Sequence, residues 1–174
     1  MNPHIELARN AIAGYIKGRK IIDIPENLPP EFYEKRCGVF VSVHSEKELR
    51  GCVGTYMPAH KSLAEEIILN SIAACSQDHR FHPISAKELP NLSIEVSLLG
   101  APEKISGLND LNSKKYGVIV KCSGGRCGLL LPDLEGVDSV EKQLSIACQK
   151  GKINPTLDKD FEIFRFGVKK IVEV

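Results

Sequence analysis

The sequence predicts an α+β protein that combines a mainly antiparallel sheet with about three helices. Two observations carry this prediction. Strand-like segments occur in pairs joined by short polar turns, and three longer segments have capping residues ahead of apolar positions at helical spacing. No linker rich in Pro, Gly or Ser and no fixed-period repeat interrupts the chain. We therefore expect residues 1–174 to form one domain without an independent second domain, and a division into a large and a small lobe stays open.

Each expected helix has a recognisable boundary. Asn2 followed by Pro3 is an N-cap with proline in the first turn, and Ser62-x-x-Glu65 is a capping box. Gly151 ends the third helix, as glycine commonly does. The expected helices cover residues 3–19, 62–76 and 139–150.

Alternating residues mark the expected strands at 39–44 and Leu92–Leu98, and the second of these alternates most strictly. Polar residues at 45–48 form the turn of a first hairpin, and Gly124-Gly125 forms the turn of a second one. Residues 20–36 contain three prolines and are expected to be an extended connection. The expected strands cover residues 39–44, 49–56, 92–98, 116–121 and 127–131, with one or two more within 161–174.

The composition excludes several classes of protein. The chain has 23 Lys and Arg against 22 Asp and Glu, and a net charge of +1 provides no overall field to recruit nucleic acid or an anionic membrane. No apolar run approaches the ~18 residues of a membrane span, and the first residues lack the pattern of a signal peptide. We therefore expect a cytoplasmic protein whose six cysteines are reduced. Nucleotide-binding and metalloprotease motifs are missing, so no cofactor and no metal ion is predicted.

The segment Leu49–Tyr56 carries the strongest chemical signal. In a strand, Arg50, Cys52 and Gly54 share one face, and an arginine beside a cysteine favours the nucleophilic thiolate. Gly51 and Gly54 have no side chain beyond a hydrogen atom, which allows a ligand to approach the backbone. The alternative is that Cys52 is a small buried hydrophobe in a strand weakened by glycine.

Two further places could supply partners for Cys52. Asp78 and Arg80 lie in a loop just after the second helix, where a carboxylate or base for the cysteine could reside. The alternative is that Arg80 and His79 complement the negative end of that helix. Glu95 lies on an alternating strand, and it becomes a candidate acid or base only if its face is shared with Cys52.

Cys122 and Cys127 flank the second hairpin turn. A two-residue turn at Gly124-Gly125 would place these cysteines directly opposite each other. That pair could form a strained disulfide or half of a zinc site, but no second pair has the spacing of zinc ligands. Two ordinary reduced cysteines are the favoured interpretation.

Leu49-Arg-Gly-Cys-Val-Gly-Thr55 resembles the hallmark L-R-G-C-[IV]-G-T segment of the AMMECR domain family. Further segments resemble that family in the same order. These segments are Asp78-x-Arg80-Phe81-x-Pro83, Ile94–Ser97, Tyr116–Ile119, Gly128–Pro132 and Ala147-Cys148-x-Lys150. Three positions depart from the family pattern. His79 replaces a usual proline, the stretch after Pro132 is short and lacks a usual tryptophan, and Gly151-Lys152 replace a usual A-G.

The resemblance implies a two-lobed fold with the hallmark segment near a cleft between the lobes. Prokaryotic members are often encoded beside, or fused to, a Memo-type protein that resembles extradiol dioxygenases, together with a radical S-adenosylmethionine (radical SAM) protein. These two proteins are therefore the expected partners. The candidate catalytic residues are Cys52, Asp78 and Glu95, and the candidate ligand-binding residues are Arg50, Gly51, Gly54, Thr55 and Arg80.

Three functional hypotheses follow from these residues. The first is a cysteine-centred enzyme or enzyme component with Cys52 as nucleophile, and the second is a non-catalytic module in which Arg50 and Arg80 bind an anionic ligand or a protein. Nucleic-acid binding is the least favoured of the three, because the charge is balanced and basic runs are missing.

Overall fold

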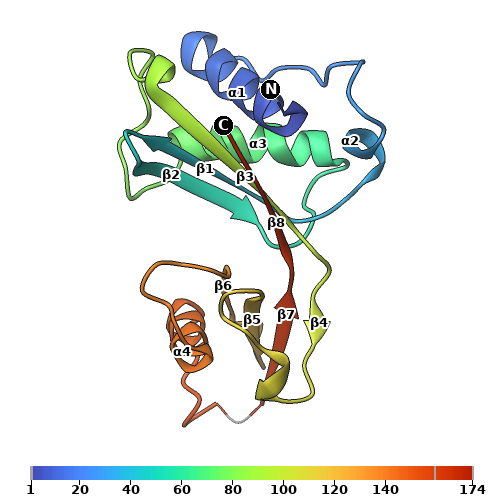
Figure 1. The fold of residues 1–174 in the computed structure, drawn as a ribbon, viewed down its shortest axis with the longest axis vertical. Coiled ribbons are helices and arrows are strands. Elements are labelled where there is room, and N and C mark those ends of the chain that lie inside the picture. The colour runs from blue at the N-terminus through green and yellow to red at the C-terminus, as the bar shows by residue number, and fades with distance from the viewer. Residues whose placement is uncertain (1, 159, 174) are drawn as a thin grey trace. The chain divides into compact units, whose positions relative to one another are not determined.

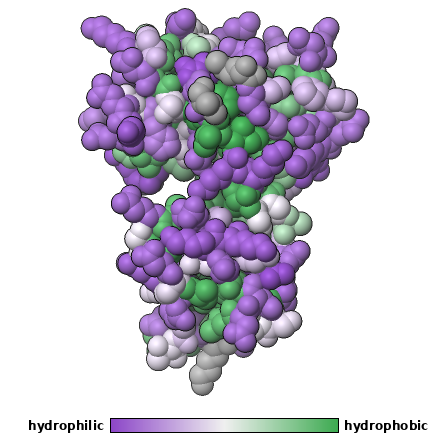
Figure 2. All heavy atoms as spheres, in the orientation of Figure 1, coloured by the Kyte–Doolittle hydropathy of each residue, from purple (hydrophilic) through white to green (hydrophobic). Residues whose placement is uncertain are grey.

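The computed structural model describes residues 2–158 and 160–173. The chain divides into two compact units, Met1–Leu98 with Lys169–Val174 and Leu99–Val168. Each unit has its own four-stranded sheet, ordered β2-β1-β3-β8 in the first and β4-β7-β5-β6 in the second (Figure 1). The predicted α+β class is confirmed. Hydrophilic side chains dominate the face drawn in Figure 2, and within the described residues no helix is long and apolar enough to cross a membrane.

The first unit contains two of the predicted helices, each with the expected cap. The Asn2 side chain accepts a hydrogen bond from the His4 N–H (3.0 Å), and the Ser62 hydroxyl accepts one from the Glu65 N–H (3.3 Å). Its elements are α1 (Pro3–Gly18), α2 (Glu31–Glu34), β1 (Val39–Ser45), β2 (Glu48–Thr55), α3 (Leu63–Ser76), a 3-10 turn (Leu89–Asn91), β3 (Leu92–Leu99) and β8 (Val168–Val172).

Helix α2 corrects the expectation that residues 20–36 are extended throughout. Pro30 occupies its N-cap position, and Glu31 places an acidic side chain in its first turn. Proline and acidic residues both suit the start of a helix. Phe32 is completely buried, so packing against the core stabilises a turn too short to form alone.

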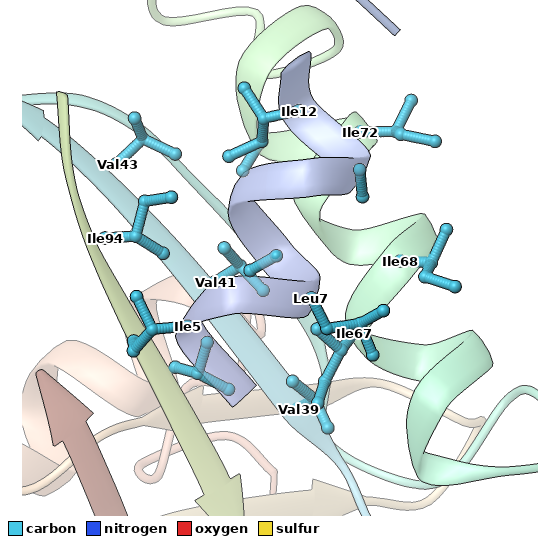
Figure 3. Packing of buried hydrophobic residues seen from close by; sticks show 14 of the residues in the cluster. Ile5, Leu7, Ile12, Val39, Val41, Val43, Ile67, Ile68, Ile72 and Ile94 are labelled. Carbon is cyan, nitrogen blue, oxygen red and sulfur yellow. The ribbon is translucent and has the colours of Figure 1, made fainter. Parts of the chain in front are cut away.

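Strand β1 lies between β2 and β3 and pairs antiparallel with both. Val39, Val41 and Val43 are fully buried against α1 and α3, which lie together over one face of the sheet (Figures 1 and 3). Successive strand residues point to opposite faces, so Phe40, Ser42 and His44 point away from the helices. The apolar core partners of the valines include Ile5, Leu7, Ile12, Ile67, Ile68, Ile72 and Ile94.

The second unit contains the third predicted helix and the second hairpin. Ser139 caps the helix by accepting a hydrogen bond from the Lys142 N–H (3.2 Å). The elements of this unit are β4 (Glu103–Lys104), a 3-10 turn (Leu108–Asp110), β5 (Gly117–Cys122), β6 (Cys127–Leu130), α4 (Val140–Lys150) and β7 (Phe161–Phe166).

The register of the second hairpin corrects the predicted pairing of two cysteines. Cys127 lies opposite Lys121, and the Cys122 N–H donates to the Arg126 carbonyl (2.9 Å), so the loop has three residues rather than two. A one-residue change in register moves a side chain to the other face of the sheet. Cys122 is therefore buried in the core while Cys127 is partly exposed, and all six thiols are free.

The end of the chain forms two strands that belong to different sheets. Strand β7 pairs with β5 in the second unit, whereas β8 lies beside β3 in the first. The sequence predicted one or two strands here. No local pattern predicts that β7 and β8 join different sheets, because the neighbour of a strand depends on residues far away in the chain.

Candidate functional site

Cys52 lies on β2, an edge strand of the first sheet. Its cross-strand partner on β1 is Ser42, and Ser42 in turn lies opposite Glu95 on β3. The three half-buried residues form a row on the sheet face opposite the helices. The Ser42 hydroxyl donates a hydrogen bond to Cys52 Sγ over 3.2 Å. The structure thus places the predicted Cys52 and Glu95 on one face and adds Ser42 between them.

The loop after α3 holds the main chain of Cys52. Asp78 Oδ2 accepts a hydrogen bond from the Cys52 N–H (2.9 Å), and Arg80 Nη2 donates one to the Cys52 carbonyl (3.2 Å). Arg80 also binds both carboxylate oxygens of Asp78, at 2.9 Å from Nε and 2.7 Å from Nη2. The pair, which we call the edge clamp, occupies main-chain groups that an edge strand leaves unpaired.

The charges of the edge clamp stabilise each other. Hydrogen bonding from the Arg80 side chain is the main cause that holds the pKa of Asp78 well below its usual range, and the N–H groups of Cys52 and Arg80 act in the same direction. The pKa of Arg80 is raised, chiefly by Asp78 and to a lesser extent by Cys52. A carboxylate that is ionised at neutral pH accepts hydrogen bonds but has no proton to donate. These contacts support a structural role for Asp78, and its catalytic role stays a prediction.

We expect Asp78→Asn to lower the free energy of unfolding by about 2 kcal/mol at pH 7, since a buried charge-assisted acceptor is lost. Because the folded pKa of Asp78 is depressed, the carboxylate stabilises the protein above the unfolded value of about 3.9 and loses this effect as the pH falls. The difference from the unsubstituted protein should therefore shrink below pH ~4. Urea unfolding from pH 7 to pH 3 measures it, and a pH-independent difference would contradict the assignment.

Arg50 makes its ion pair elsewhere. Its Nε and Nη2 donate to Glu88 Oε1 at 3.0 and 2.8 Å, and Nη2 also reaches the His82 carbonyl (3.4 Å). Hydrogen bonds from the Ser85 backbone, and then from Arg50, lower the pKa of Glu88. Arg50 thus ties β2 to the 82–88 segment, and Arg80 is the cation whose hydrogen bond reaches Cys52.

The two glycines of the hallmark segment lie against protein atoms. A Cβ on Gly51 would lie 2.0 Å from the carbonyl oxygen of Ala74, so α3 packs directly on the strand there. A Cβ on Gly54 would lie 2.4 Å from the Phe40 ring, on the other face. Close packing accounts for both glycines, and their contact with a ligand stays a prediction.

Thr55 belongs to a buried polar cluster that the sequence analysis missed. Its hydroxyl donates to Glu66, whose other oxygen accepts the N–H groups of Ala59 (3.0 Å) and His60 (2.9 Å). Asn70 donates to the Val39 carbonyl (3.1 Å), and Glu66 is only 1% exposed. The cluster anchors the segment that leads from β2 to α3.

A sequence signal for this cluster did exist. Glu66 and Asn70 are four residues apart, so they share a face of α3 with buried apolar residues. Two polar residues on the apolar face of a helix predict that both side chains are buried and hydrogen-bonded. The sequence does not show which groups are their partners. Within the described residues, no group of three or more His, Cys, Asp and Glu side chains is arranged to hold a metal ion.

Comparisons with known proteins agree with the resemblance seen in the sequence. The AMMECR1 family model matches residues 5–171. A protein of Thermotoga maritima is 46% identical over 170 residues, which cover 97% of each chain. A protein of Clostridium acetobutylicum is 42% identical over 97% of this chain, which spans only 36% of that longer protein. The crystal structure of a protein from Pyrococcus horikoshii matches with a TM-score of 0.87 at 34% identity, covering 96% of this chain and 88% of the other. This chain therefore belongs to the AMMECR1 family.

Proposed function

We propose that the chain is a thiol-dependent enzyme, or the thiol-bearing component of one, with Cys52 as its nucleophile. The observation that carries this proposal is the hydrogen bond from the Ser42 hydroxyl to the half-buried sulfur of Cys52. A hydrogen bond from a hydroxyl to a negatively charged thiolate is stronger than one to a neutral thiol, so this contact favours the thiolate form. The edge clamp adds a fixed main chain, which holds the sulfur in one place.

The arrangement suits attack on an electrophilic carbon. The Cys52 thiolate forms the new sulfur–carbon bond, and the leaving group departs with the electron pair of the bond that breaks. Glu95, on the same face, is the proposed base that takes the proton of the Cys52 thiol and then gives it to the leaving group. The Ser97 hydroxyl donates a hydrogen bond to the Glu95 carboxylate (3.2 Å). Among the described residues, no ion pair involves Glu95.

A first test is the order in which the six cysteines react with iodoacetamide at pH 7. Cys52 and Cys127 are the two that are partly exposed, so we expect them to be labelled first. Cys75 should be the slowest, because it is buried and burial raises the pKa of its thiol to about 11. Mass spectrometry of each cysteine measures the rates. Labelling of Cys52 only after unfolding in urea would remove the proposed nucleophile.

The function itself is tested by replacement in cells that lack the native gene. Cys52→Ser should fail to restore normal growth or metabolite levels, because an alcohol at this position is a far weaker nucleophile than a thiolate. Cys127→Ser is the matched control, since Cys127 is also partly exposed but lies in the other unit. Full activity of the Cys52→Ser protein would overturn the proposal.

We also propose that the chain works with a Memo-type protein and a radical SAM protein, inside the reducing cytoplasm. The resemblance of the hallmark segment supports this proposal, because prokaryotic members of that family are often encoded beside these two proteins. In the Clostridium acetobutylicum relative the matching region is part of a much longer polypeptide. Co-expression of the tagged chain with both proteins from the same organism, followed by affinity purification, tests the partnership. Recovery of the tagged chain alone would count against it.

One observation favours a second candidate, a non-catalytic binding module. Both arginines near Cys52 are held rigidly by carboxylates, and the Arg80 side chain is still 52% exposed. A fixed guanidinium with a free edge suits an anionic ligand or partner. In this case Cys52→Ala should leave partner binding unchanged, while Arg50→Ala should abolish it. Retention of binding in Arg50→Ala would contradict this candidate.

A further inference from the structure

We infer that Ser42 is a positioning residue that acts on the sulfur of Cys52, tuning its reactivity by hydrogen bonding. This inference deepens the proposed function, since it concerns control of the same sulfur. Ser42 lies outside the hallmark segment and on a different strand, so nothing in the pattern around Cys52 points to it.

The strand register brings the two side chains together. Cys52 directs its N–H and carbonyl towards the edge clamp, which lies outside the strand pair formed by β1 and β2. In an antiparallel pair, opposite residues that do not exchange main-chain hydrogen bonds have the closer side chains. The 3.2 Å between Ser42 Oγ and Cys52 Sγ matches this class of pair. The edge clamp and the serine contact are therefore consequences of one register.

The two arginines near Cys52 donate their hydrogen bonds to other groups, so Ser42 is the direct hydrogen-bond donor to the sulfur. The recorded hydrogen bonds of Arg50 go to Glu88 and the His82 carbonyl, and those of Arg80 go to Asp78 and the Cys52 carbonyl. Within the described residues, the side-chain hydrogen bond recorded for the Cys52 sulfur is the one from Ser42. A hydroxyl has a single proton, so its donation to the sulfur leaves no proton for another acceptor.

The position of Ser42 also favours a fixed geometry. It lies on β1, which is paired on both sides, between buried Val41 and Val43. A short side chain on such a strand has few rotamers to lose when it orients its hydroxyl. The donor is thus attached to a strand that is paired on both sides, while the sulfur is on the edge strand.

The test follows thiol–disulfide exchange of Cys52 with neutral hydroxyethyl disulfide from pH 6 to pH 10. The Cys52 thiolate attacks one sulfur, a mixed disulfide forms, and mercaptoethanol leaves as its thiolate. Loss of the donor in Ser42→Ala should move the midpoint of the pH–rate curve up by about one pH unit. Because a more basic thiolate is more nucleophilic, the rate should fall by about threefold at pH 7 and rise by about threefold on the high-pH plateau.

Two variants and one internal reference make the result specific. Ser42→Thr keeps a hydroxyl on a strand position and should retain the original curve. Ser93→Ala removes an exposed hydroxyl from the same sheet face and should leave the curve unchanged. Cys127, in the other unit, reports on any general change in each sample.

A purely structural role of Ser42 would not make the pH–rate curves of the unsubstituted protein and of Ser42→Ala cross. An Ser42→Ala curve that coincides with the original, a rate that changes in one direction at every pH, or a parallel change at Cys127 would each overturn the inference. The result is independent of the replacement test in cells. Normal function of Cys52→Ser would reject the proposed enzyme while leaving the effect of Ser42 on the sulfur measurable.

Discussion

Gly51→Ala is expected to lower the free energy of unfolding by about 3 kcal/mol or more, because the added methyl group overlaps the main chain of α3. Its Cβ would lie 2.0 Å from the carbonyl oxygen of Ala74 and 3.0 Å from the carbonyl carbon. A backbone atom in a packed helix cannot rotate away as a side chain can. The strand or the helix must therefore shift, which also disturbs the strand that carries Cys52. Equilibrium unfolding in urea measures the loss.

Gly107→Ala provides the matched control. A Cβ at Gly107 would have no heavy atom within 4 Å, and the residue has no positive φ. We expect a change within about 0.5 kcal/mol for this variant. Equal stabilities of the two variants would show that α3 does not approach the strand as closely as described.

Glu66→Ala is expected to cost about 3 kcal/mol, since it removes a buried carboxylate that accepts three hydrogen bonds. The N–H groups of Ala59 and His60 lose their acceptor, so the segment between β2 and α3 should open more readily. Glu66→Gln keeps the volume and one acceptor oxygen, and we expect about half of that cost. Urea unfolding gives the stabilities, and limited proteolysis reports on the segment.

The neighbouring Glu65 serves as the control for Glu66. Glu65 accepts a single exposed hydrogen bond from the Lys61 N–H (3.0 Å), so Glu65→Ala should cost at most about 1 kcal/mol. If both alanine variants unfold at the same urea concentration, then Glu66 is not the anchor of this segment.

Several features of the fold could be predicted from neighbouring residues alone. The caps at Asn2, Ser62 and Ser139 located three helices, because a side chain that accepts an N–H two or three residues ahead is a local interaction. Alternation located β1 and β3 for the same reason, since burial of one face depends on a period of two. The polar turn at residues 45–48 located β2 as the hairpin partner of β1. The hallmark segment identified the family, which the comparisons confirm.

Contacts between distant segments decided the rest. The sequence singled out Arg50, Cys52 and Asp78, but it could not show that Arg50 binds Glu88 or that Asp78 holds the main chain of Cys52. It also offered no reason to select Ser42, whose importance depends on which residue of β2 lies opposite.

The physical reason is that register and edge position are properties of the whole sheet. Moving a strand by one residue leaves its sequence pattern intact but exchanges the faces of all its side chains. That is why Cys122 and Cys127, expected opposite each other, point to different faces. Local sequence was sufficient to locate α1, α3, α4, the two hairpins and β3, and to identify the family. Contacts between distant segments decide which side chains meet at Cys52.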